Sequence, residues 1–336
     1  MPFYSGCTPT HVERPLAGVG QRRCIPRRRT TEYVDSNDYH ASRGPGAPLF
    51  HEVCVPDSAL QEIVCCIGQP VAGNPTQFMM QRVLAHLGLD WCYLTLEVAP
   101  ADLGDALRGI RALGFRGVSL SIPHKVAAIP WLDALSESAE LMGAVSCVCR
   151  EGERLVGDNT DGRAFTESLS ELCDPTDKRV LLLGAGGVAR AIAVELARRG
   201  VAEILVANRT AERGQVLVEL LEQRLATAAR LLPWDGSLVV PEDAGIVINA
   251  TSVGLLDSEA RLAIEPQSLH SGLIVADAVF NPPQTWLLKE ARRRGCRTLN
   301  GLGMLVNQAA INFQLWTGLE PDKAIMREAV EEYLEI

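Results

Sequence analysis

The sequence is short of several features that would point to particular classes of protein. No apolar run approaches the roughly 18 residues that span a bilayer, so we expect no membrane-spanning helix. The six histidines stand apart, without an H-x-x-x-H or Cys/His cluster, and we expect no bound metal. The ten cysteines include no C-x-x-C pair, which predicts reduced thiols and a cytoplasmic protein. Basic residues are also few, with 32 Lys and Arg against 41 Asp and Glu, which argues against a nucleic-acid partner.

What remains is an ordinary globular composition, 47% hydrophobic and 22% charged, over 336 residues, a length that suggests two domains. The first fifty residues differ from the rest because they carry seven arginines and four acids among Pro, Gly, Ser and Thr, without helical or strand periodicity. We expect residues 1–57 to form a disordered Arg-rich extension. The alternatives are a transit peptide, which is also Arg-rich and acid-poor, and a start codon assigned too early.

Alternating strand-like and helix-like blocks begin near residue 60 and predict the fold class. Such alternation indicates an α/β protein with mostly parallel sheets and helices on their faces. A polar run at residues 157–162 separates two series of blocks, so we expect two α/β domains that face each other across a cleft. The first series has expected strands at 63–68, 91–98 and 117–122, and expected helices at 78–87, 103–113 and 125–132. The second has expected strands at 180–183, 203–207, 245–248 and 273–276, and expected helices at 188–199, 214–225, 305–316 and 321–333.

A glycine-rich turn opens the second series. The segment Gly184-Ala185-Gly186-Gly187-Val188 follows an apolar strand and begins a helix, which is the order found in dinucleotide-binding turns. Gly184 makes the tight turn, and Gly186 lets the backbone approach a pyrophosphate. The free N–H groups at the start of the following helix then receive the phosphates. The turn therefore predicts a bound dinucleotide.

The end of the next expected strand favours one dinucleotide over another. A fold selective for NAD usually carries Asp or Glu there, to bind the ribose 2′-hydroxyl. This chain instead has Asn208-Arg209-Thr210, with Arg213 one turn further on. Two guanidinium groups and two small polar side chains suit a 2′-phosphate. We therefore predict NADP as the cofactor.

Two ionisable residues, Lys125 and Asp161, stand where expected elements meet the cleft. Taken alone, a Lys and an Asp this far apart in sequence are more often surface residues than partners. Their surroundings, however, resemble the shikimate dehydrogenase family, from about residue 63 to the C-terminus. The motifs that carry the resemblance are, in order, S-L-S-I-P-H-K, S-E-S-A-E-L-M-G-A-V, G-D-N-T-D-G, G-A-G-G, N-R-T, N-A-T-S-V-G and G-L-G-M-L-V-N-Q-A.

The resemblance implies an NADP-dependent oxidoreductase that reversibly oxidises shikimate to 3-dehydroshikimate, in chorismate and aromatic amino-acid biosynthesis. It implies a substrate domain of residues 58–161 and 301–336 and a Rossmann-type, doubly wound NADP-binding domain of residues 162–300. Lys125 and Asp161 match the catalytic pair, in which the lysine moves the hydroxyl proton and the aspartate orients it. Beyond the glycine-rich turn and Asn208, Arg209, Thr210 and Arg213, the expected cofactor contacts are Thr251, Ser252, Ala278, Gly301 and Glu137.

The substrate side departs from the family's usual pattern. The expected substrate contacts are Asn74, Thr76, Ser119, Ser121, Ser146, Phe280 and Gln308. Asn74 and Thr76 replace a Ser-x-Ser pair that binds the substrate carboxylate, Ser119 and Ser146 stand where Asn is common, and Phe280 stands where Tyr is usual. Each missing hydrogen bond to a substrate can cost about 1–3 kcal/mol, so several changes together can retune specificity.

Alternatives to shikimate oxidation therefore stay open. Quinate or a related cyclic hydroxy-acid is a second substrate class. A non-catalytic NADP-binding sensor would need a spoiled catalytic pair, whereas Lys125 and Asp161 are both present. Methylene-tetrahydrofolate dehydrogenases share the two-domain layout, and the segments around these two residues favour the shikimate family over them. The sequence leaves both a monomer and a homodimer open.

Overall fold

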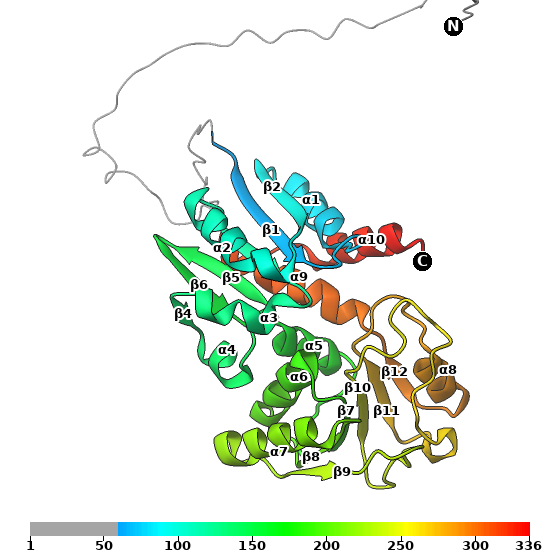
Figure 1. Ribbon diagram of the computed structural model, residues 1–336. Helices are drawn as coiled ribbons and strands as arrows, with labels where there is room; N and C mark the ends of the chain where they lie inside the picture. Colours follow the sequence, from blue (N-terminus) through cyan, green and yellow to red (C-terminus); the bar gives the residue numbers. More distant parts are fainter. Residues whose placement is uncertain (1–59) are drawn as a thin grey trace, which may run out of the picture. The chain divides into compact units, whose positions relative to one another are not determined.

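Two six-stranded sheets organise the part of the chain that the structure, a computed structural model, describes (Figure 1). That part is residues 60–336, so the extension expected at residues 1–57 lies outside it. The α/β class predicted from the alternating blocks is confirmed. Within residues 60–336, no helix combines the length and the apolar character needed to cross a membrane.

The first sheet is mixed, with the strand order β2-β1-β3-β5-β6-β4. Strand β1 runs parallel to β2 and β3, whereas β5 is antiparallel to β3 and β6. The turn between β5 and β6 holds only Gly152 and Glu153, and so short a link joins only antiparallel strands. The strands are β1 (Glu62–Gly68), β2 (Trp91–Glu97), β3 (Gly117–Leu120), β4 (Ala134–Leu135), β5 (Cys147–Glu151) and β6 (Arg154–Asp158).

The predicted length of the helix over residues 125–132 is wrong. It is the four-residue α3 (His124–Ala127), followed by a separate 3-10 turn at Ile129–Trp131. Pro130 has no N–H to donate to a continuing α-helix, which explains the break. The other helical elements of this part are α1 (Thr76–His86), the 3-10 turn Pro100–Asp102, α2 (Leu103–Ala112) and α4 (Glu137–Met142).

The second sheet is parallel throughout, with the order β12-β11-β10-β7-β8-β9. The chain enters at the central strand β7, builds outward in one direction and then returns to build in the other. Ligands bind at the carboxyl ends of the strands at such a switch point. The strands are β7 (Arg179–Leu183), β8 (Glu203–Ala207), β9 (Ala229–Leu232), β10 (Ile246–Asn249), β11 (Ile274–Asp277) and β12 (Arg297–Leu299). The helical elements are α5 (Asp161–Ser170), α6 (Gly187–Arg198), α7 (Ala211–Leu225), the 3-10 turn Pro266–Ser268 and α8 (Trp286–Arg293).

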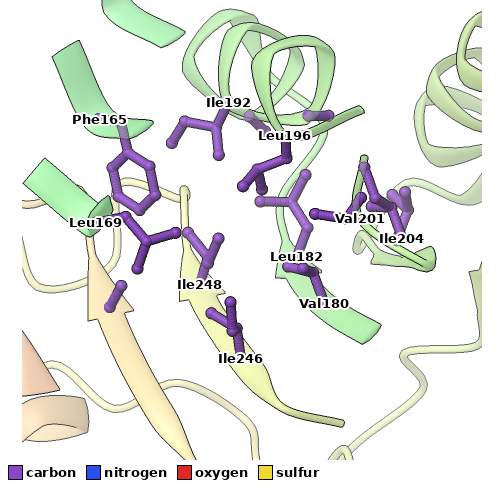
Figure 2. Packing of buried hydrophobic residues seen from close by; sticks show 14 of the residues in the cluster. Phe165, Leu169, Val180, Leu182, Ile192, Leu196, Val201, Ile204, Ile246 and Ile248 are labelled. Atoms are coloured by element: carbon purple, nitrogen blue, oxygen red, sulfur yellow. The ribbon is translucent and has the colours of Figure 1, made fainter. Parts of the chain in front are cut away.

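After Arg179, strand β7 is apolar to its end because both of its faces are buried. Val180 and Leu182 pack with side chains of α5 and α6 on one face (Figure 2), and Phe165 and Ile192 are among these partners. Leu181 and Leu183 point to the opposite face and pack with the apolar side of α8. The central strand is therefore fixed between two helical layers.

The last two helices, α9 (Leu302–Thr317) and α10 (Lys323–Leu334), return to the first sheet. They are the orange and red helices of Figure 1, where α10 lies beside α1. Met304, near the start of α9, packs in the core of the second sheet, whereas Phe313 and Trp316 pack with Val64 and Tyr93 of the first. Helix α9 thus contacts both cores.

Candidate active site

A cavity of about 400 Å³ lies where the carboxyl ends of strands from both sheets meet α9. One wall comes from the ends of β1 and β3, the start of α1 and α3. The other comes from the glycine-rich turn and the loops after β10 and β11. Of the predicted site residues, those that line the cavity are Asn74, Thr76, Ser119, Ser121, Lys125, Asp161, Gly186, Gly187, Val188, Thr251, Ser252, Ala278, Phe280, Gly301 and Gln308.

Lys125 and Asp161 form an ion pair inside this cavity. The distance from Lys125 Nζ to Asp161 Oδ2 is 2.5 Å, and the side chains are 20% and 1% exposed. Gln308, from α9, donates its amide N–H to the other carboxylate oxygen, Oδ1. Asp161 is the first residue of α5, where the positive end of the helix dipole stabilises a carboxylate. The pair therefore presents a held ammonium group, with exchangeable protons, to whatever occupies the cavity.

The position of Lys125 follows from the buried residue before it. His124 is fully buried and its Nε2 lies 2.9 Å from the carbonyl oxygen of Val98, while its backbone N–H donates to Ser121 O. These contacts fix the first turn of α3, on which Lys125 is the next residue. His124 therefore has a structural role: it lies outside the cavity lining and holds the turn that carries Lys125.

Ser146, predicted to contact substrate, does not line the cavity. It is fully buried, and its Oγ accepts a hydrogen bond of 2.8 Å from the backbone N–H of Thr160. Thr160 Oγ1 in turn donates to Asn312 Oδ1 at 2.8 Å, and Asn312 Nδ2 donates to Ser119 Oγ at 3.0 Å. Ser146 therefore supports the residue that precedes Asp161, from inside the protein.

Asn312 is a lining residue that the sequence interpretation missed. It lies four residues after Gln308 on α9, so the two side chains share one face of the helix. This spacing is the signal that could have found it. Asn312 Nδ2 donates to Ser119 Oγ and so holds a second lining side chain in place.

Asn74 and Thr76 lie at the start of α1, on the substrate side of the cavity. Asn74 Oδ1 accepts a hydrogen bond of 2.9 Å from the backbone N–H of Thr76, so the amide nitrogen of Asn74 is turned toward Cys66 Sγ at 3.9 Å. Cys66 also lines the cavity and was not among the predicted residues. Burial raises the pKa of the Cys66 thiol to about 12, which keeps it protonated and a poor nucleophile.

The glycine-rich turn has the space and the donors that a nucleotide phosphate requires. A side chain at Gly184, whose φ is +112°, would lie 2.9 Å from the carbonyl oxygen of Ala250. Gly186 and Gly187 face open space, and no side chain caps the N-terminus of α6. The first N–H groups of this helix are therefore free to bind an anion. Gly184 and Ala185 shape the turn without lining the cavity.

The predicted 2′-phosphate group of residues lies at the neighbouring strand end. Gly184 N–H donates to the carbonyl oxygen of Ala207, which joins the glycine-rich turn to the end of β8. Asn208 Nδ2 donates to Thr210 O at 2.7 Å and holds this corner. Arg209 and Arg213 are exposed outside the cavity, and neither forms an ion pair within residues 60–336. Both guanidinium groups are therefore available to an anionic ligand.

Glu137, predicted to lie beside the cofactor, does not line the cavity. Its side chain is 89% exposed, and it pairs with Arg198 of α6 at 3.1 Å. This contact ties the first residue of α4 to the helix that follows the glycine-rich turn.

One further carboxylate near the cavity was not among the predicted residues. Asp277, the last residue of β11, is fully buried, and its burial raises the carboxyl pKa to about 6 although three hydrogen bonds to the carboxylate act to lower it.

For metals, the residues from 60 onward contain no group of three His, Cys, Asp or Glu side chains arranged to hold an ion.

Comparison with known proteins gives consistent matches along the chain. A model of the shikimate dehydrogenase substrate binding domain matches residues 66–148, a shikimate/quinate 5-dehydrogenase model matches 167–256, and a shikimate 5′-dehydrogenase C-terminal domain model matches 301–331. A shikimate dehydrogenase (NADP(+)) from Methanopyrus kandleri is 40% identical over 287 residues, which cover 84% of this chain and 99% of that protein.

Two solved structures extend the comparison. A ligand-free 5-ketofructose reductase of Gluconobacter sp. strain CHM43 is 42% identical with a TM-score of 0.78, over 82% of this chain and 99% of that one. A quinate dehydrogenase from Corynebacterium glutamicum, in complex with NAD, is 32% identical with a TM-score of 0.76, over 81% of this chain and 99% of that one.

Proposed function

The chain belongs to the shikimate dehydrogenase family, and on that basis we propose that it catalyses the reversible, NADP-dependent oxidation of shikimate to 3-dehydroshikimate. The observation that carries the proposal is the buried pair of Lys125 and Asp161, which shares one cavity with Gly186 and Gly187 of the glycine-rich turn. A proton-transfer group and a phosphate-binding turn are the two parts that a nicotinamide-dependent dehydrogenase needs.

Lys125 is proposed to move the proton of the reaction. When bound, NADP supplies the acceptor for the hydride that leaves the carbinol carbon. During reduction the Lys125 ammonium group gives a proton to the carbonyl oxygen, and during oxidation the resulting amine takes up the hydroxyl proton. Asp161 Oδ2 holds the nitrogen in place throughout, while Gln308 fixes the other carboxylate oxygen.

The proposed roles of the remaining residues depend on which wall of the cavity they belong to. We propose that Asn74, Thr76, Ser119, Ser121, Phe280 and Gln308 contact substrate. Gly186, Gly187, Val188, Thr251, Ser252, Ala278 and Gly301 would hold the dinucleotide, and Arg209 and Arg213 its 2′-phosphate. The free guanidinium groups and the uncapped start of α6 support NADP, because both interact favourably with phosphate.

The wider assignments follow the same reasoning. We propose a substrate domain of residues 58–161 and 301–336 and a cofactor domain of residues 162–300, supported by the packing of α9 and α10 with β1 and β2. A cytoplasmic location is proposed from the free state of the seven cysteines among residues 60–336. A monomer or a homodimer remains the proposed assembly.

Reduction of a neutral polyhydroxy ketone is a second candidate function. The similarity to a 5-ketofructose reductase favours it. So does the composition of the cavity, because Lys125 is the only cationic residue among the described residues that line it, and Asp161 neutralises it. Asn74 and Thr76 then offer only neutral donors to a carboxylate.

A substrate panel tests these proposals. The kcat/KM values for shikimate, quinate and fructose would be measured with NADP and with NAD, from the absorbance of the reduced cofactor at alkaline pH. We expect shikimate with NADP to give the highest value, and Lys125→Ala to lower turnover by about 100-fold or more. Oxidation of fructose but not shikimate would support the second candidate. Tight NADPH binding without turnover of any member would support a sensor.

A further inference from the structure

The buried carboxylate of Asp277 is hydrogen-bonded to the two loops, after β10 and after β11, that form part of the proposed cofactor wall of the cavity. Asp277 does not line the cavity. Its Oδ1 accepts hydrogen bonds of 2.9 Å from both the backbone N–H of Val279 and Asn249 Nδ2, and its Oδ2 accepts one of 2.7 Å from Thr285 Oγ1. These donors come from its own strand end, from the end of β10 and from the N-cap of α8. Within residues 60–336, Asp277 has no cationic partner to offset its charge.

Asn249 links Asp277 to the loop after β10 through hydrogen bonds of its side-chain amide. Because its amide nitrogen faces Asp277, its Oδ1 faces the other way and accepts from Thr251 N at 3.0 Å and Thr251 Oγ1 at 2.7 Å. Thr251 Oγ1 accepts in turn from Val253 N at 3.1 Å. Ala250 and Thr251 line the cavity, so the orientation of one buried amide sets the conformation of that wall.

Val279 passes the constraint to the segment after β11. Its N–H is bound to Asp277, and its carbonyl carbon and oxygen lie so close to Gly301 that a Cβ there would be 2.5 Å from both. Ala278, Val279 and Phe280 all line the cavity. This segment is therefore held from one side by Asp277 and from the other by the start of α9.

A buried, unpaired carboxylate is costly to keep, and none of its atoms reaches the cavity. Two of its three hydrogen bonds, those from Asn249 and Val279, hold the walls just described, and the third, from Thr285, joins it to the N-cap of α8. We propose that Asp277 is a positioning residue that fixes both loops of the cofactor wall, so that its loss weakens dinucleotide binding while the Lys125–Asp161 pair stays intact. This inference rests on the proposed function, because it takes the occupant of that wall to be a nicotinamide dinucleotide.

The test is equilibrium binding of NADPH, followed by its fluorescence in the absence of substrate. The proteins are wild type, Asp277→Ala, Asp277→Asn and the control Asp243→Asn, which alters an exposed carboxylate at the opposite end of the sheet. Asp277→Ala is expected to raise the dissociation constant about tenfold or more, and Asp277→Asn, which keeps hydrogen-bonding atoms in place, about threefold at pH 8. Asp243→Asn is expected to bind as wild type does.

The pH dependence separates a positioning role from general damage to the fold. The side chains that face Asp277, those of Asn249 and Thr285, do not titrate, and no charged group contributes to its raised pKa of about 6. As pH falls, Asp277 becomes protonated and comes to resemble Asn. The ratio of the Asp277→Asn to the wild-type dissociation constant should therefore decline from about threefold at pH 8 toward one at pH 5. The 2′-phosphate of the probe titrates equally in both measurements and cancels.

A wild type that binds NADPH, with Asp277→Ala binding equally well, overturns this inference alone. So does a ratio that does not change with pH, which keeps the test decisive if Asp277→Ala fails to fold. A folded wild type that binds no NADPH overturns the proposed function and the inference together. Tenfold weaker binding with the declining ratio supports the positioning role.

Discussion

Replacing Asp277 with Asn is expected to remove a pH-dependent loss of stability from the protein. Burial raises the carboxyl pKa from 3.8 to about 6, so the folded state binds this proton more tightly than the unfolded state does. Between these two values the unfolded chain gives up its proton first. The free energy of unfolding of the wild type therefore falls as pH rises through this window and stays lower above it.

The size of the effect follows from the shift. About two pKa units correspond to about 3 kcal/mol in total. Roughly half of that loss is already present at pH 5, which leaves about 1–2 kcal/mol between pH 5 and pH 8. Asn has a similar shape and cannot ionise. The difference in unfolding free energy between Asp277→Asn and wild type should therefore grow by about 1–2 kcal/mol, in favour of the variant, over this range.

Urea unfolding at pH 5, 6.5 and 8, followed by circular dichroism, measures this difference. All other carboxylates titrate alike in both proteins, so they cancel. Asp243→Asn serves as the control, because this side chain is 63% exposed and lies beside Arg179. Parallel stability curves for wild type and Asp277→Asn would refute the reasoning, because they would mean that the carboxyl group titrates equally in the folded and unfolded states. If Asp277→Asn is more stable than wild type but binds NADPH less well, the wild-type carboxylate lowers stability while it strengthens NADPH binding.

Three further outcomes are expected. Lys125→Ala should lower kcat by about 100- to 10,000-fold, whereas Lys289→Ala, at a surface pair with Glu259, should leave kcat unchanged; comparable kcat values for the two variants would remove Lys125 from the mechanism. Gly162→Ala places a Cβ 2.2 Å from the carbonyl oxygen of Ala191 and should lower the free energy of unfolding by about 1–3 kcal/mol. Its control, Gly109→Ala, meets open space in α2 and should raise the free energy of unfolding by about 0.5–1 kcal/mol. Urea unfolding measures both. The double variant Arg209→Ala/Arg213→Ala should raise the KM for NADP about tenfold or more with little change for NAD, measured by steady-state kinetics; an equal rise for both would contradict the 2′-phosphate assignment.

Local patterns were enough to predict the four inner strands of the second sheet, whereas the edge strands β9 and β12 were missed. An uninterrupted apolar strand, a glycine-rich turn and an amphipathic helix are read from neighbouring residues, and β7, α6 and β8 begin and end within a residue of the expected ranges. The first sheet was harder, because the tight turn at Gly152 makes β5 and β6 an antiparallel hairpin within a parallel series. Helix α8 was missed as well, although Thr285 accepts a hydrogen bond from Leu288 N–H and caps its start.

The sequence by itself determined the α/β alternation, the glycine-rich turn, the arginines after β8 and the two ionisable residues, because each of these depends on neighbours along the chain. Only the tertiary structure decided which groups meet. Gln308 reaches Asp161 across 147 positions, and Asn312 reaches Thr160 across 152, because α9 returns to the first sheet. The same packing turned Ser146 into the interior and buried Asp277 among Asn249, Val279 and Thr285. Burial and hydrogen-bond partners arise from the fold as a whole, and they separate the residues that line the cavity from those that hold its walls.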